Sequence, residues 1–164
     1  MPQAQIPSPI GGVRVTVDAH GAVVAVVFVD DELAGGGEPG PAAEAVRQIE
    51  EYFAGSRRDF DLPLAPGGSE FERRVWAELV RIPFGATESY GAIAQRLGDA
   101  GLSRAVGAAN ARNPIAVVVP CHRVVGAAGD LTGYAGGLWR KRWLLAHESG
   151  QRRLAFGDAH AMNR

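Results

Sequence analysis

Residues 103–126, SRAVGAANARNPIAVVVPCHRVVG, contain most of what decides this fold. The small residues at the start of this stretch predict a short helix from Ser103 to Asn110, with Ser103 as its N-cap. The apolar, β-branched residues after Asn113 predict a buried extended segment that leads into Cys121. Because Cys121 is the only cysteine of the chain, it has no partner for an internal disulfide.

The composition is that of a globular protein. Hydrophobic residues make up 46% of the 164 residues, and the longest apolar stretch, residues 22–29, is too short to span a bilayer. The first residues lack the pattern of a signal peptide, so we expect a cytoplasmic protein without membrane contact. The scattered histidines offer no zinc-ligand spacing around Cys121, so we expect neither a metal nor another cofactor.

Charge is divided unevenly along the chain. Residues 1–68 carry 4 basic and 10 acidic residues, a net charge of −6, whereas residues 69–150 carry 10 basic and 7 acidic residues, a net charge of +3. The second half is therefore suited to a polyanionic partner, although a mixed solvated surface would give the same counts.

Residues 1–68 are expected to form an α/β domain, which ends within the Pro/Gly break APGGS. Apolar residues at 13–17 and 22–29 flank the turn DAHG and predict a β-hairpin whose second strand is buried on both faces. The stretch AAEAVRQIEEYFAG predicts a helix that covers the sheet and closes at Gly55.

Residues 69–150 are expected to form a mostly helical domain, followed by a tail at 151–164. Ser69 and Glu72 form a capping-box pattern before an amphipathic helix. The short helix at 90–98, the turn DAGL and the helix from Ser103 predict a helix-turn-helix, and residues 138–148 predict a closing helix.

The second helix of this motif is thin, because Ala105, Gly107 and Ala108 carry almost no side chain. A thin helix can approach the floor of the minor groove, which is about 6 Å wide, and Arg104 at its start could insert into a base stack. The alternative is that small residues only let two helices pack closely.

Cys121 is either an inert buried residue or a nucleophile. A nucleophilic thiol needs a base or a positive neighbour, and His122 and Arg123 offer both. His122 reaches the thiol only if the chain turns there or a water bridges them. Glu148 could orient the imidazole, or it is a solvated acid at a helix end. The Gly-rich residues 126–137 lack the lysine and hydroxyl of a nucleotide loop, so they predict a flexible pocket wall, in which Tyr134 stacks on a flat substrate or simply packs.

With PCHRVVG preceded by SRAVGAANARNPI and followed by LTGYAGGLWRKRWLLAHE, the sequence resembles the O6-alkylguanine-DNA alkyltransferases, also called methylated-DNA-protein-cysteine methyltransferases. The resemblance covers residues 69–148 and extends more weakly through YFAGSRRDFDLPL. It implies a ribonuclease H-like α/β N-terminal domain and a mostly α C-terminal DNA-binding domain with a helix-turn-helix. It also implies a monomer that binds duplex DNA from the minor groove, flips out an O6-alkylguanine and moves the alkyl group irreversibly to its cysteine.

Carried over by position, the resemblance implies a reactive network of four residues. Cys121 accepts the alkyl group and His122 is its water-mediated base. Glu148 orients His122, and Asn113 braces the turn that presents the thiol. It further implies that Tyr90 hydrogen-bonds the guanine and that Arg104 fills the vacated stack beside Ala105, Gly107 and Ala108. The expected pocket consists of Tyr134 and Lys141, with the backbone of Cys121, Val124 and Ala135 reading the base edges.

Two residues depart from the family pattern. Ala111 stands where glycine is usual, and a left-handed backbone there would cost alanine about 1 kcal/mol. Glu72 stands where glutamine is common. Two other functions compete: a damage sensor that binds alkylguanine without reacting, whose known relatives lack the cysteine, and a cysteine hydrolase, which leaves Arg104 without a role.

Overall fold

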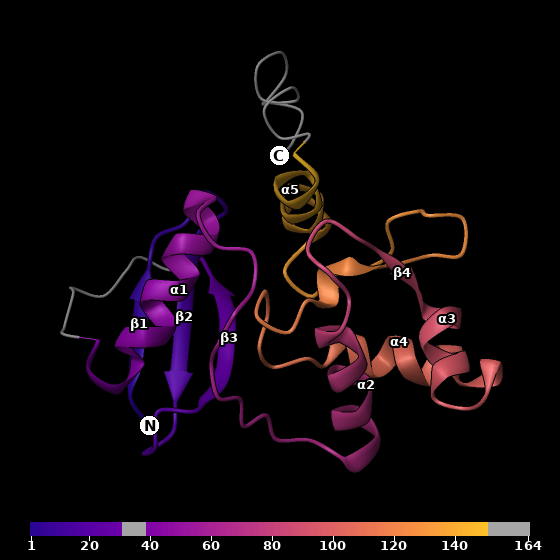
Figure 1. The fold of residues 1–164 in the computed structure, drawn as a ribbon, viewed down its shortest axis with the longest axis horizontal. Helices are drawn as coiled ribbons and strands as arrows, with labels where there is room; N and C mark the ends of the chain where they lie inside the picture. Colours follow the sequence, from indigo (N-terminus) through magenta and orange to yellow (C-terminus); the bar gives the residue numbers. More distant parts are fainter. Residues whose placement is uncertain (31–38, 151–164) are drawn as a thin grey trace. The chain divides into compact units, whose positions relative to one another are not determined.

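The computed structural model describes residues 1–30 and 39–150, and the expected tail at 151–164 lies outside them. The chain forms two compact units, drawn in Figure 1. The first consists of Met1–Gly68 and Pro114–Val118, and the second of Ser69–Asn113 and the residues from Val119 onward. Among the described residues, no helix is both long and apolar enough to cross a membrane.

The first unit is built on a three-stranded antiparallel sheet in the order β1-β2-β3. Strands β2 (Gly12–Val17) and β3 (Val23–Val29) form the expected hairpin, whereas β1 (Gln3–Ile6) was not expected, because glutamines interrupt its apolar pattern. The expectation that β3 is buried on both faces is wrong, since Val27 is exposed.

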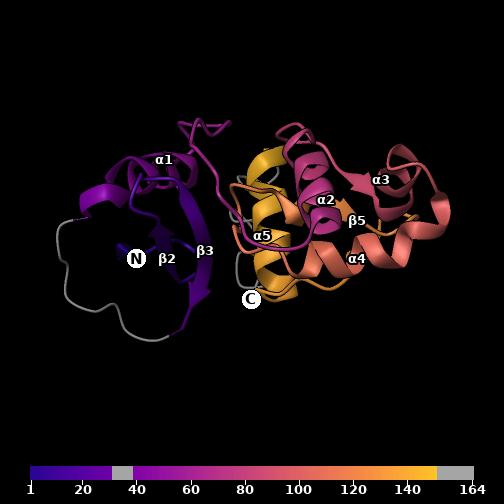
Figure 2. The ribbon, with the colours of Figure 1, turned by 90° about the horizontal axis from the view of Figure 1, so that it is seen from below.

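One face of this sheet is covered by α1 (Ala43–Ala54), which follows the 3-10 turn Gly40–Ala42 (Figure 2). Val13, Val15 and Val17 alternate along β2 and are fully buried, as a strand with one covered face requires. The helix ends at Gly55, whose φ of 86° is the left-handed conformation that glycine adopts without strain.

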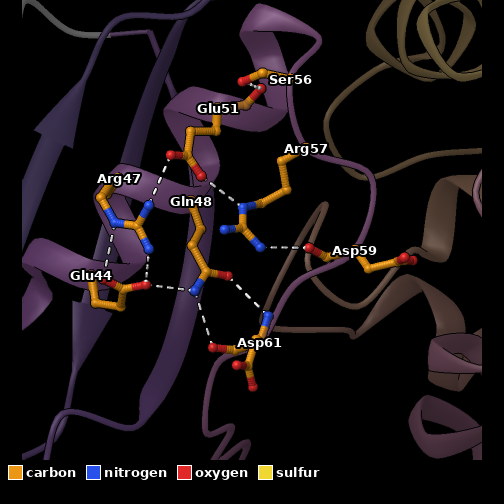
Figure 3. A network of polar contacts seen from close by, with 8 residues as sticks. All are labelled: Glu44, Arg47, Gln48, Glu51, Ser56, Arg57, Asp59 and Asp61. Atoms are coloured by element: carbon orange, nitrogen blue, oxygen red, sulfur yellow. Dashed lines mark hydrogen bonds and ion pairs between the residues drawn. The ribbon is translucent and has the colours of Figure 1, made fainter.

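A polar network fastens the chain after α1 back onto the helix (Figure 3). The buried Gln48 amide accepts a hydrogen bond from the Asp61 N–H at 2.9 Å and donates to the Asp61 carbonyl at 3.1 Å. Arg57 donates to Glu51 at 2.8 Å and to the Asp59 carbonyl at 2.9 Å. These bonds order a segment that has no secondary structure of its own.

The segment Pro114–Val118 belongs to the first unit although it is distant from it in the chain. It runs along β3, where the Val26 N–H donates to Pro114 at 2.9 Å and the Ala116 N–H donates to Val26 at 3.0 Å. The next residue, Val117, has a φ of 71° and lies at the centre of a tight turn closed by a 2.8 Å bond from Val118 to Ala116. This conformation is strained for a β-branched residue and costs of the order of 1–3 kcal/mol.

The second unit begins with α2 (Glu70–Val80), whose capping box between Ser69 and Glu72 is present as expected. The expected helix-turn-helix is confirmed and consists of α3 (Tyr90–Arg96), a 3-10 turn (Ala100–Leu102) and α4 (Ser103–Ala111). Strands β4 (Glu88–Ser89) and β5 (Val124–Val125) pair in parallel, and α5 (Leu138–Ser149) ends the described chain.

One expectation about α4 is wrong, and the possible backbone cost at Ala111 does not arise. Its N-cap is Leu102 and not Ser103, because the Ser103 hydroxyl donates to the Ala100 carbonyl at 2.9 Å in the preceding 3-10 turn. Ala111 does not need a left-handed backbone, since Val117 is the only non-glycine residue of positive φ in the described chain. The glycine usual at that position is therefore not required here.

Candidate active site

Cys121 begins a 3-10 turn, Cys121–Arg123, named η3 here, which contacts α2 and α5. Pro120 precedes it with a φ of −81° and a ψ of 65°, and the Cys121 N–H bonds back to the Val119 carbonyl at 2.8 Å. The chain thus turns at the cysteine, and the extended geometry that would separate adjacent side chains does not apply. The thiol is buried and no disulfide engages it.

Two asparagines at the end of α4 hold the backbone of this turn. The Asn113 amide donates to the Val119 carbonyl at 2.8 Å, and the buried Asn110 amide donates to the Cys121 carbonyl at 3.4 Å. Asn113 was expected to brace the turn. Asn110 was not, although two asparagines three residues apart at a helix end are a recognisable signal for such bracing.

His122, Arg123 and Glu148 form a buried charged cluster. His122 Nε2 lies 2.7 Å from Glu148 Oε2. Arg123 donates from Nε to Oε1 at 2.7 Å and from Nη2 to Oε2 at 2.9 Å, and its Nη1 donates to the Ile82 carbonyl at 2.7 Å. Glu148 is therefore not a solvated helix-end acid. Arg123 is also not the positive neighbour of the thiol, because its guanidinium faces the carboxylate.

The protonation states of this cluster follow from its geometry. Burial alone would raise the pKa of Glu148, but His122 and the two Arg123 hydrogen bonds outweigh it and hold that pKa well below its usual range. Burial lowers the pKa of His122, against the opposing effect of Glu148. An ionised carboxylate only accepts, so His122 Nε2 carries the proton. The buried Nδ1 is then unprotonated, and no described residue hydrogen-bonds to it.

The thiol is protonated at rest. Burial raises the pKa of Cys121, while the hydrogen bond of Asn113 and the charge of Lys141 act in the opposite direction. The Tyr134 hydroxyl is buried close to the thiol, and burial together with Cys121 raises its pKa well above the usual value. A buried, protonated thiol needs a base at the moment of reaction, and the neutral imidazole of the next residue can act as one.

Lys141 joins α5 to the strand and loop that follow the turn. Its ammonium group is fully buried and donates to the Val124 carbonyl at 2.7 Å and to the Thr132 carbonyl at 3.3 Å. The Val124 carbonyl thus already accepts one hydrogen bond, from Lys141, whereas Ala135 is exposed. Lys141 therefore holds the backbone at Val124 and Thr132 together, and its charge acts on the thiol.

Tyr90 connects this loop to the helix-turn-helix. It is the first residue of α3, and its hydroxyl lies 2.6 Å from Thr132 Oγ1. A Cβ placed on Gly107 of α4 would lie 3.8 Å from the Tyr90 ring, an ordinary contact. Gly107 therefore faces Tyr90 and is half-buried.

The small residues of α4 lie on two different faces, and the structure shows close packing on one of them. Arg104, Ala105 and Ala108 are exposed. On the opposite side Ala109 is buried, and its carbonyl accepts a 2.8 Å hydrogen bond from the Trp76 indole of α2. While α4 packs against α2, its exposed side therefore carries small side chains, with Arg104 near the N-terminus of the helix.

Comparison with known proteins identifies the family of this chain. Residues 3–66 match the model of the ribonuclease-like domain of 6-O-methylguanine DNA methyltransferase, and residues 70–150 match the model of its DNA-binding domain. The chain belongs to this methyltransferase family. The family match confirms the expected fold class, an α/β ribonuclease-like domain and a DNA-binding domain with a helix-turn-helix.

Relatives in the methyltransferase family cover nearly the whole chain. The methylated-DNA–protein-cysteine methyltransferase of Mycobacterium bovis is 46% identical over 87% of this chain and 89% of its own length. The crystal structure of the Mycobacterium tuberculosis O6-methylguanine methyltransferase is 42% identical, covers 90% of this chain and 92% of its own, and superimposes with a TM-score of 0.81. A structure of Mycobacterium tuberculosis OGT in complex with DNA is 43% identical, covers 91% of this chain and 93% of its own, and superimposes with a TM-score of 0.82.

Proposed function

We propose that this methyltransferase repairs O6-alkylguanine in duplex DNA by moving the alkyl group to the Cys121 sulfur, once per molecule. The observation that carries this proposal is the buried, unpartnered Nδ1 of a neutral His122 directly after the single thiol of the chain. Residues 69–150 are the part that we assign to alkyl transfer and DNA binding, and residues 1–68 form the accompanying α/β domain.

In the proposed reaction, the thiol proton passes through a bridging water to His122 Nδ1. Sγ then attacks the alkyl carbon in line, the bond from that carbon to guanine O6 breaks, and its electron pair stays on the guanine. Glu148 stabilises the imidazolium that forms. The Tyr90 hydroxyl exchanges Thr132 for a ring nitrogen of the guanine and stabilises the charge that develops there.

The thioether that forms has no good leaving group, and the chain contains no second cysteine to resolve it. One molecule therefore removes one alkyl group. This stoichiometry separates the proposal from a cysteine hydrolase, which would turn over repeatedly. The presence of Cys121 separates it from a damage sensor that binds without reacting.

For DNA, we propose that the exposed face of α4 enters the minor groove and that the target base is flipped out of the stack. The small Ala105 and Ala108 side chains support a close approach, and the exposure of Arg104 at the start of the helix supports its insertion into the gap. The net charge of +3 on residues 69–150 supports binding to phosphates with little sequence preference. We propose that the protein acts as a monomer in the cytoplasm.

Arg104→Ala tests base flipping. We expect it to slow repair of duplex DNA by about 10- to 100-fold, because extruding a base costs a few kcal/mol that the inserted arginine partly offsets. Reaction with a free O6-alkylguanine base should be unchanged, since nothing is extruded. The measurement is the rate of alkyl transfer to Cys121 from each substrate.

Arg81→Ala is the matched control, because it removes another exposed arginine, at the end of α2. It should leave both rates unchanged. Equal losses on the duplex and on the free base in Arg104→Ala would show that Arg104 supports the fold instead.

A further inference from the structure

The exposed face of α4 has a second arginine at its other end. Arg104, Ala108 and Arg112 are four residues apart in turn, so they share one side of the helix. All three are exposed, and the Arg112 side chain, at the C-cap of α4, has 70% of its surface free. At 1.5 Å per residue, the two arginines begin about 12 Å apart along the helix axis.

Arg112 has one weak partner in the described chain. Its Nη1 lies 3.5 Å from Glu72 Oε2, at the upper limit for a hydrogen bond. A guanidinium has five N–H donors in a planar fork, so the remaining donors of Arg112 stay available on the surface. An exposed ion pair of this length is easily exchanged for a better acceptor.

Glu72, by contrast, is fixed in place. Its Oε1 accepts a hydrogen bond from the Ser69 N–H at 2.9 Å, and the Ser69 hydroxyl accepts one from the Glu72 N–H at 3.0 Å. Only 17% of the Glu72 side chain is exposed. The capping box of α2 thus holds a carboxylate at the end of the exposed face of α4, where it limits the positions that Arg112 can adopt.

We propose that Arg112 binds a backbone phosphate of the DNA beside the groove that Arg104 enters, and that Glu72 holds the guanidinium at that place until the phosphate replaces it. The proposal rests on the function proposed above. In the proposed arrangement α4 crosses the minor groove, which is about 6 Å wide, so a residue about 12 Å along the helix from the inserted arginine lies beyond the groove floor, where the phosphates are. A phosphate accepts two parallel bonds from the guanidinium fork, whereas Glu72 accepts one long bond.

The test measures how binding of an undamaged duplex depends on salt concentration. We expect Arg112→Gln to weaken binding roughly tenfold at low salt and to reduce the slope of log Kobs against log[salt] by about 0.9, the value for one lost phosphate contact. Arg112→Lys should retain the slope, because the slope counts charges. Arg81→Gln is the matched control: it removes an arginine with 77% of its side chain exposed at the opposite end of α2 and should not change the slope.

Glu72→Gln tests the role of the carboxylate. Glutamine preserves the capping box but carries no charge, so we expect binding to tighten several-fold with the slope of the wild type. In the Arg112→Gln background most of this gain should disappear, because the guanidinium that the substitution frees is absent. A gain of the same size in both backgrounds would overturn the role of Glu72.

The outcomes separate this proposal from the one on which it rests. If Arg112→Gln has the same slope as Arg81→Gln, the phosphate contact is wrong, while a selective loss of duplex repair in Arg104→Ala still supports the proposed function. If the wild-type protein binds duplex equally at low and high salt, both proposals fail.

Discussion

Cys121→Ser is expected to abolish alkyl transfer while leaving duplex binding and the melting temperature near those of the wild type. His122 can take the proton of the buried thiol at the moment of reaction, whereas a serine hydroxyl has a much higher pKa than a thiol and gives a far weaker nucleophile toward an alkyl carbon. The substitution nearly preserves volume, so the turn held by Asn110 and Asn113 should persist.

The measurement is a titration of the protein with excess DNA that carries labelled O6-methylguanine. The wild type should accept one labelled group per active molecule, all of it in the peptide that contains Cys121. Transfer by Cys121→Ser, label at another residue, or release of more than one repaired guanine per active molecule would contradict the mechanism.

Glu148→Gln is expected to have the largest effect on stability. Glu148 neutralises the buried Arg123 through two hydrogen bonds, and the amide would leave that cation uncompensated. Breaking a buried pair in this way costs about 3–5 kcal/mol, which would lower the melting temperature of a domain of this size by more than about 10 °C. Glu88→Gln is the matched control: its pair with Arg96, at 2.7 Å, is exposed, and the expected loss is below about 1 kcal/mol.

The pH dependence of stability gives a second readout for Glu148. Its folded pKa is depressed, so its contribution is complete above its ordinary pKa of 4.5 and is lost as the pH falls below that value. The pKa of His122 is also lowered, so protonation of this residue in the unfolded state costs further stability below pH 6.5. The difference between wild type and Glu148→Gln should therefore shrink below about pH 4.5. A difference that stays constant down to pH 3 would show that the loss comes from packing alone.

Local chemistry determined where the α-helices of this protein lie, and the sequence was sufficient to predict them, although the N-cap of α4 is Leu102 and not the expected Ser103. The Ser69–Glu72 capping box, the terminal Gly55 and the spacing of apolar residues along α1 act over a few neighbouring residues, so they specify helix ends without the rest of the fold. The motif PCHRVVG and its flanks likewise specify the family, because its residues are consecutive or closely spaced.

Tertiary structure decided the direction in which side chains point and the partners that distant segments find. Arg123 follows His122 in the chain, but its direction depends on Glu148 of α5 and the Ile82 carbonyl after α2, which only packing brings to η3. The placement of Pro114–Val118 along β3 depends on hydrogen-bonding groups left open at that strand edge. Burial of the Lys141 ammonium group depends on two carbonyls from separate segments that accept hydrogen bonds from it. Such partners lie many residues apart, and no local pattern encodes them.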